Sequence, residues 1–165
     1  NIHPAGTASG VVVASPQTDN PNYFRHWIRD AALVMDVILQ KYQRATTYQE
    51  RKTLHNLIVK FMHFSIENQN RSSLGEPIFE VSGNPFLGPW GRPQNDGPAL
   101  RAIVFSKWAL SLIKDGKIDF VKKYLYNGIP PFKAPFPKMR EPNTTGYKSC
   151  PMIETIAVMS LGVYW

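Results

Sequence analysis

Apolar residues recur at helical spacing along most of the chain. From Asp30 the segment AALVMDVILQKY is apolar on nearly all sides, which predicts a helix beginning near Asp30 that neighbours cover on several faces. Thr47, with Glu50 three residues later, forms a capping signature for the next helix. Its predicted apolar stripe is Leu54, Leu57, Ile58, Phe61 and Phe64. The opposite face carries Arg51, Lys52, Asn56, Lys60 and Glu67, so this helix should lie outside another layer.

A polar stretch precedes the third predicted helix. Residues 68–95 are rich in Asn, Ser, Gly and Pro and predict a long loop, which we expect to be ordered because it holds aromatic residues. Asp96 is the predicted N-cap of a helix over 99–114, and Gly116 ends that helix. Its predicted buried stripe is Leu100, Ile103, Val104, Trp108 and Leu112.

The pattern changes near the C-terminus. Residues 118–126 predict a short helix with Ile118, Val121 and Leu125 facing inward. Residues 129–151 are Pro-rich without periodicity, and an apolar segment begins at 152. Near the N-terminus, 10–14 predicts a small strand. An all-round apolar helix alternating with a one-sided helix indicates an all-α, two-layer architecture.

Composition narrows the function classes. The net charge of +7 raises the hypothesis of nucleic-acid binding, but the basic residues are scattered, which favours solvated helix faces. Cys150 is the single cysteine, so no intrachain disulfide forms, and the four His lack zinc-ligand spacing. No apolar run is long enough to span a membrane, and no signal peptide is visible at the N-terminus.

The stretch ASPQTDNPNYFRHWIRD, residues 14–30, brings turn formers, aromatic rings and charges together. Arg and Asp side chains can bond hydroxyl groups, while Trp and Tyr rings can stack on sugar C–H faces. The alternative is that the aromatics belong to the core and that Arg29 with Asp30 is an ion pair at a helix end. A second stretch has the same character, because Trp90 lies between Pro89 and Gly91 and Arg92 follows. For Trp90 the alternative to sugar stacking is that its ring is buried and anchors the loop.

With both stretches the chain resembles the fungal and yeast glucoamylases, glycoside hydrolase family 15. The segments that carry the resemblance are SGVVVASPQTDNPNYFRHWIRDAALV, LGEPIFEV and PWGRPQNDGPALRA, within residues 9–126. The resemblance implies an (α/α)6 barrel, of which this chain would hold an incomplete part, with the active site at one end of the barrel. It also implies exo-acting hydrolysis of α-1,4 links, and more slowly α-1,6 links, at the non-reducing ends of starch, glycogen and malto-oligosaccharides. β-Glucose would be released by inversion, through two carboxyl groups and without a cofactor.

The resemblance assigns substrate-binding residues one by one. Arg29 and Asp30 match the pair that bonds the terminal glucose, Tyr23 and Trp27 match the aromatics beside it, and Trp90 matches the tryptophan near the scissile bond. Arg25 and His26 fall where relatives often carry Tyr and Thr or Gln, so we expect a different pocket rim.

The family pattern is lost after Gly128. Relatives continue into a motif of the form DLWEEVNG with the general acid, whereas this chain continues as IPPFKAPFPKMREP. Glu141 and Glu154 lack the flanking residues of that motif, and the family's base would lie beyond Trp165. We therefore expect 1–128 to be the N-terminal portion of a glucoamylase catalytic domain, 129–165 to be a non-homologous tail, and no catalytic carboxylate in this chain. The hypothesis is a truncated or altered gene product, either inactive or retaining only sugar binding.

Cellular location stays open at this stage. Most relatives are secreted and some act in the vacuole, and sequons at Asn70 and Asn143 matter only on the secretory route. If the chain folds, we expect a monomer.

Overall fold

The computed structural model describes residues 1–71 and 75–126. Its helices are α1 (Ile28–Arg44), α2 (Tyr48–Arg71), α3 (Asp96–Lys114) and the short α4 (Ile118–Phe120), which continues as a π-helical turn, η1 (Val121–Tyr126). Two short strands, β1 (His26–Trp27) and β2 (Ile78–Phe79), pair antiparallel. The predictions for Gly128, Glu141, Glu154 and the rest of the tail concern residues outside the described ranges.

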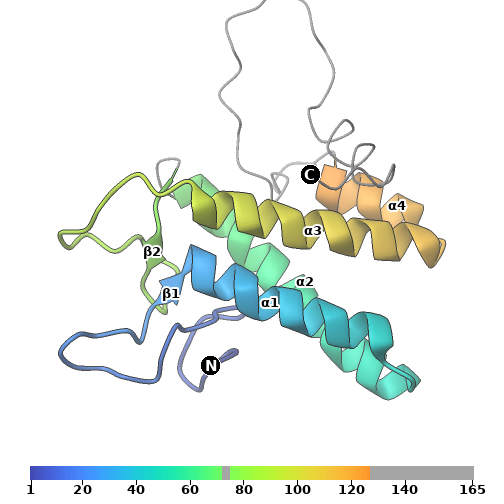
Figure 1. Ribbon diagram of the computed structural model, residues 1–165, viewed down its shortest axis with the longest axis horizontal. Helices are drawn as coiled ribbons and strands as arrows, with labels where there is room; N and C mark the ends of the chain where they lie inside the picture. The colour runs from blue at the N-terminus through green and yellow to red at the C-terminus, as the bar shows by residue number, and fades with distance from the viewer. Residues whose placement is uncertain (72–74, 127–165) are drawn as a thin grey trace, which may run out of the picture.

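The three long helices pack against one another, and Phe61 on α2 stacks directly on Phe105 on α3. Helix α1 packs against both α2 and α3, and Figure 1 shows β1 and β2 at the end where α1 and α3 begin. The core combines side chains of all three helices, including the fully buried Met35, Phe61 and Trp108. This arrangement confirms the predicted mostly helical, layered fold. Leu33 and Val37 remain 53% and 52% exposed on the free face of α1, so the described part covers this apolar helix incompletely.

Several local predictions are confirmed. The Glu50 backbone N–H donates to Thr47 Oγ1 at 3.2 Å, which is the expected capping bond. Gly116 follows α3 with a φ of +75°, and its N–H donates to the Ile113 carbonyl. Val104, Trp108 and Leu112 are buried as predicted, although Leu100 and Ile103 are only partly buried.

Other local predictions are wrong. The first residues of the predicted 68–95 loop complete α2, and Ile78–Phe79 forms a strand because a distant partner, His26–Trp27, supplies its hydrogen bonds. Residues 10–14 form isolated bridges instead of a strand. Of the three residues predicted to face inward over 118–126, Val121 and Leu125 are buried, but Ile118 is 45% exposed.

Asp96 is the most informative of these corrections. It is the first residue of α3, so Asn95 occupies the cap position, and no side chain caps the helix. The Asp96 carboxylate instead pairs with Arg29 on α1 and accepts the N–H of Gly97 at 2.9 Å. A contact between helices therefore takes the place of the predicted local cap.

Two glycines offer a matched test of the packing between the N-terminal segment and α2. Gly10 and Gly6 both have positive φ, +87° and +78°, but a Cβ at Gly10 would lie 2.2 Å from the Lys60 carbonyl oxygen, whereas one at Gly6 meets open space. We expect Gly10→Ala to lower the free energy of unfolding by at least about 2 kcal/mol, from backbone strain plus overpacking. Gly6→Ala should lower the free energy of unfolding by about 1 kcal/mol, because it introduces backbone strain without overpacking. Urea unfolding of both variants measures the difference, and equal losses would contradict the close approach of Gly10 to α2.

Candidate functional site

The short strand pair positions the start of α1. Trp27 pairs with Ile78, and the Ile28 N–H donates to the Pro77 carbonyl at 3.0 Å. This pairing fixes the chain immediately before the helix. Arg29 and Asp30 consequently lie in the first turn of α1, beside the start of α3.

Three aromatic rings form a row at this end of the helices. The Trp27 ring lies 6.3 Å from that of Tyr23 and 4.9 Å from that of Trp90, which it meets edge-on at 82°. Trp27 is 8% exposed, whereas Tyr23 and Trp90 are 38% and 47% exposed. Trp27 therefore forms the inner part of the row, and the other two rings form its solvent-facing ends. The buried Trp27 Nε1–H has no acceptor among the described residues.

Arg29 and Asp96 border the row and join the first turns of α1 and α3. Their side chains are 46% and 47% exposed. Partial desolvation acts to raise the pKa of Asp96, but hydrogen bonds from the Arg29 guanidinium and the Gly97 N–H keep this pKa below its usual value. The alternative of an Arg29–Asp30 ion pair is wrong, because the partner of Arg29 is Asp96. Asp30 is half-buried, and its side chain makes no hydrogen bond within residues 1–71 and 75–126.

A shallow surface depression with almost no enclosed volume, which we call the pocket, lies between these elements. Its lining residues are Trp27, Ile28, Arg29, Pro77, Gln94, Asp96 and Gly97. Gly97 permits the close approach of α3 to α1, since a Cβ there would lie 3.0 Å from Ile28 Cγ2 and 3.1 Å from the Arg29 nitrogen. The pocket thus presents an indole beside a guanidinium–carboxylate pair, which suits a neutral ligand with hydroxyl groups and apolar C–H faces.

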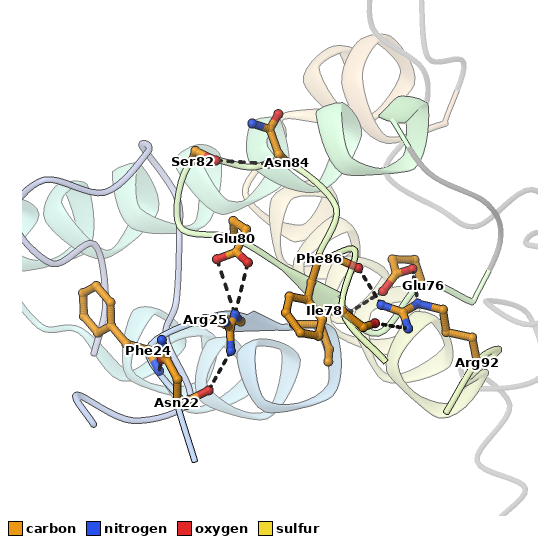
Figure 2. Close-up of polar contacts among 11 residues, drawn as sticks. Asn22, Phe24, Arg25, Glu76, Ile78, Glu80, Ser82, Asn84, Phe86 and Arg92 are labelled. Carbon is orange, nitrogen blue, oxygen red and sulfur yellow. Dashed lines mark hydrogen bonds and ion pairs between the residues drawn. The ribbon is translucent and has the colours of Figure 1, made fainter. Parts of the chain in front are cut away.

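Two further ion pairs support the loops around the pocket. Arg92 Nε lies 2.7 Å from Glu76 Oε2, and Arg25 Nε lies 3.2 Å from Glu80 Oε1. Figure 2 shows both arginines directed toward Phe86 from neighbouring segments. The Arg25–Glu80 pair joins the residue before β1 to the residue after β2, and the Arg92–Glu76 pair joins the segment after β2 to the segment before it.

The structure brings four of the predicted residues into direct proximity, namely Tyr23, Trp27, Trp90 and Arg29, which borders the same pocket as Trp27. It adds Gln94 and Asp96, which sequence reasoning missed. In the sequence, Asp96 lies in an Asn-Asp-Gly-Pro helix start, and this motif predicts an N-cap. It does not predict an ion pair with Arg29, which is 67 residues away.

His26 does not belong to the pocket rim, in contrast to the sequence expectation. Its ring is completely buried, 4.7 Å from the Phe64 ring and 6.2 Å from the Phe61 ring. Its Nδ1 accepts the Val12 N–H at 3.2 Å. Burial, and next the positive charge of Arg101, lower the pKa of His26 to about 3. Arg25 is partly buried, pairs with Glu80 and is also absent from the pocket lining.

Within 1–71 and 75–126, no group of three or more His, Cys, Asp or Glu side chains could hold a metal ion. A search of the helices in those ranges finds none that is both long enough and apolar enough to cross a membrane.

Comparison with known proteins shows the family of this chain. The model of the glycosyl hydrolases family 15 matches residues 2–127. Glucoamylase 1 of Rhizopus oryzae is 42% identical over 121 residues, which cover 71% of this chain and 20% of that protein. The probable glucoamylase of Schizosaccharomyces pombe is 39% identical over 125 residues, which cover 70% of this chain and 27% of that protein.

Solved structures give the same result. The glucoamylase of Hormoconis resinae superposes with a TM-score of 0.67 at 39% identity, over 73% of this chain and 22% of that one. The family 15 glucoamylase of Hypocrea jecorina gives a TM-score of 0.65 at 35% identity, over 72% of this chain and 21% of that one.

The helical fold and these matches relate the chain to a class of glycoside hydrolases whose structures are helical barrels. The chain belongs to glycosyl hydrolase family 15, the family of the fungal and yeast glucoamylases, whose structures are (α/α)6 barrels. It spans about a fifth of the length of the Rhizopus relative, which is 20% covered. The described helices are accordingly consistent with part of such a barrel.

Proposed function

We propose that this chain supplies the substrate-binding wall of a glucoamylase-type hydrolase that removes glucose from the non-reducing ends of starch or glycogen. α-1,4 links are cleaved, and α-1,6 links more slowly, with release of β-glucose by inversion. In such a reaction one carboxylic acid protonates the glycosidic oxygen while a carboxylate activates water. The observation that carries the proposal is the row of Tyr23, Trp27 and Trp90 beside the Arg29–Asp96 pair.

Each group has a distinct role in this proposal. Tyr23, Trp27 and Trp90 offer ring faces and edges to the C–H faces of glucose units. Arg29 donates to hydroxyl oxygens with the guanidinium N–H groups that Asp96 leaves free, and Asp30 accepts from hydroxyl groups. Because Arg29 is already held by Asp96, its guanidinium is oriented before the sugar binds.

We assign neither the general acid nor the general base of hydrolysis to a residue within 1–71 or 75–126. Three acidic side chains near the pocket are occupied, Glu76 by Arg92, Glu80 by Arg25 and Asp96 by Arg29, and Asp30, which has no such partner among the described residues, is assigned here to hydroxyl binding. A general acid has to reach the glycosidic oxygen with its proton, and a carboxylate bound to a guanidinium is poorly suited to this task. The hydrolytic carboxyl groups are therefore expected from another part of a complete catalytic domain.

A chimera tests the hydrolytic proposal. Residues 2–127 would replace their counterpart in the Rhizopus glucoamylase, and proton NMR would follow the anomer released from maltose. We expect β-glucose as the first product, because the chimera combines this binding wall with the relative's remaining catalytic domain. The same chimera with Trp90→Ala is the control and should lose activity. A folded chimera that releases no glucose, or releases α-glucose first, would contradict the proposal.

The occupied carboxylates favour a second candidate for the chain alone, a glucoamylase fragment that binds sugar without turnover. Loss of positioned acid and base removes about 10² to 10⁴-fold of rate for each group. Incubation of the 165-residue chain with maltose should yield no measurable glucose. Glucose release that is abolished by Glu141→Gln or Glu154→Gln would contradict this candidate.

A further inference from the structure

The Phe86 ring lies between two arginines from different parts of the chain. The Arg25 guanidinium carbon lies 4.3 Å from the ring centroid, and that of Arg92 lies 5.9 Å from it. Figure 2 shows the two guanidinium groups on either side of this residue. Each arginine is in turn fixed by a glutamate, Arg25 by Glu80 and Arg92 by Glu76. Cation–π contacts of this kind favour a defined position of the ring.

Arg92 also donates hydrogen bonds to backbone carbonyls of the segment 86–92, which we call the Trp90 loop. Its Nη2 donates to the Phe86 carbonyl at 2.6 Å, and its Nη1 donates to the carbonyls of Gly88 and Trp90, each at 3.1 Å. One guanidinium therefore binds three loop carbonyls in addition to Glu76. A lysine cannot reproduce this set, because its ammonium lacks the planar fork of donors.

Apolar burial does little to hold the Trp90 loop. Leu87 is 94% exposed and Trp90 is 47% exposed. The loop folds closely over Phe86, since a Cβ at Gly88 would lie 2.2 Å from the ring carbon Cζ of Phe86. Polar contacts to Arg92 and packing on Phe86 thus restrain the loop, beside the bond from the Phe86 N–H to the Ile78 carbonyl, and the loop in turn carries the Trp90 ring that contacts Trp27.

We propose that Arg92 and Arg25 are positioning residues, which clamp Phe86 and the carbonyls of the Trp90 loop and thereby set the Trp90 indole against Trp27. The clamp acts without touching the ligand. Only the effect of the clamp on sugar affinity rests on the proposed function. Because the indole is already in place, sugar binding costs less free energy for ordering the loop.

The contact between the two indoles provides a local readout that does not depend on sugar. Coupled indole rings give an exciton band in the circular dichroism spectrum of the 165-residue chain, and Trp90→Phe identifies that band by removing it. We expect Arg92→Lys to lose most of the band while the helical signal stays and the melting temperature falls by less than about 4 °C. Maltose affinity should fall about tenfold, because the loop then has to be ordered on binding.

Arg71→Lys is the matched control. Arg71 also pairs with a glutamate, Glu67, and donates to a loop carbonyl, that of Gly83, but it makes no contact with the Trp90 loop. This variant should keep the exciton band and the maltose affinity. Phe86→Leu is the second test of the clamp, since it removes the ring between the arginines while leaving both glutamate pairs, and it too should lose the band.

Three results would overturn the clamp: absence of the band in the wild-type chain, full retention of the band in both Arg92→Lys and Phe86→Leu, or equal loss in Arg71→Lys. The failure of the proposed function is distinguishable from these results. If the chain does not bind sugar, the band and its dependence on Arg92 remain while maltose binding is absent in every variant.

Discussion

Acidification from pH 6.5 to about pH 3 should strongly destabilise this fold, and we expect His26 to be a main cause. The folded chain holds His26 neutral down to a pKa of about 3, because the ring is completely buried and near Arg101. The unfolded chain takes up the proton near pH 6.5, the ordinary value. Between these pH values only the unfolded state binds this proton, so stability falls as pH falls, by about 1.4 kcal/mol per pH unit.

Urea unfolding at a series of pH values measures this slope. His26→Gln keeps a side-chain oxygen that can accept the Val12 N–H but cannot titrate, so its slope should be smaller by the equivalent of one proton in that window. His3→Gln, the same change at an exposed histidine, is the control for the substitution itself. Identical slopes for wild type and His26→Gln would show that the His26 side chain is not buried in this way.

Replacing Arg29 should remove most of the sugar affinity and little of the stability. Hydrogen bonds to a charged group are worth about 1.5 to 3 kcal/mol, so Arg29→Ala should weaken maltose binding about 10 to 150-fold. The Arg29–Asp96 pair is nearly half exposed on both sides, so its loss should lower the free energy of unfolding by less than about 1 kcal/mol.

The matched control is Arg44→Ala, at the opposite end of the same helix. Arg44 lies in the last turn of α1, away from the pocket, and its replacement should leave maltose affinity unchanged. Titration calorimetry with maltose, beside urea unfolding of both variants, separates binding from stability. Unchanged affinity in Arg29→Ala would remove Arg29 from the binding site.

Sequence patterns predicted the features that depend on near neighbours in the chain. Three long helices, the Thr47 capping bond and the end of α3 at Gly116 all follow from residues within a few positions of one another. The same patterns failed where a distant segment decides the structure. The strand at Ile78–Phe79 forms only because His26–Trp27 lies beside it.

The candidate site shows the same division. Composition and spacing alone favoured a core position for the aromatics around Trp27 and left Trp90 open between a buried loop anchor and a sugar site, and the family resemblance selected the sugar site for both. Neither predicted that Asp96 pairs with Arg29 instead of capping the helix, because this pairing depends on how closely α3 approaches α1 at Gly97. The arginine clamp on Phe86 likewise joins residues that are far apart in sequence.

Titration of the chain with maltose, followed by NMR of the tryptophan indole N–H signals, is the most direct test of the glucose-binding wall. Trp→Phe variants assign the signals. We predict saturable shifts for Trp27 and Trp90 and none for Trp108, which is fully buried in the helical core. No shift at Trp27 and Trp90, or equal shifts at all three residues, would contradict the assignment of this end of the helices to sugar recognition.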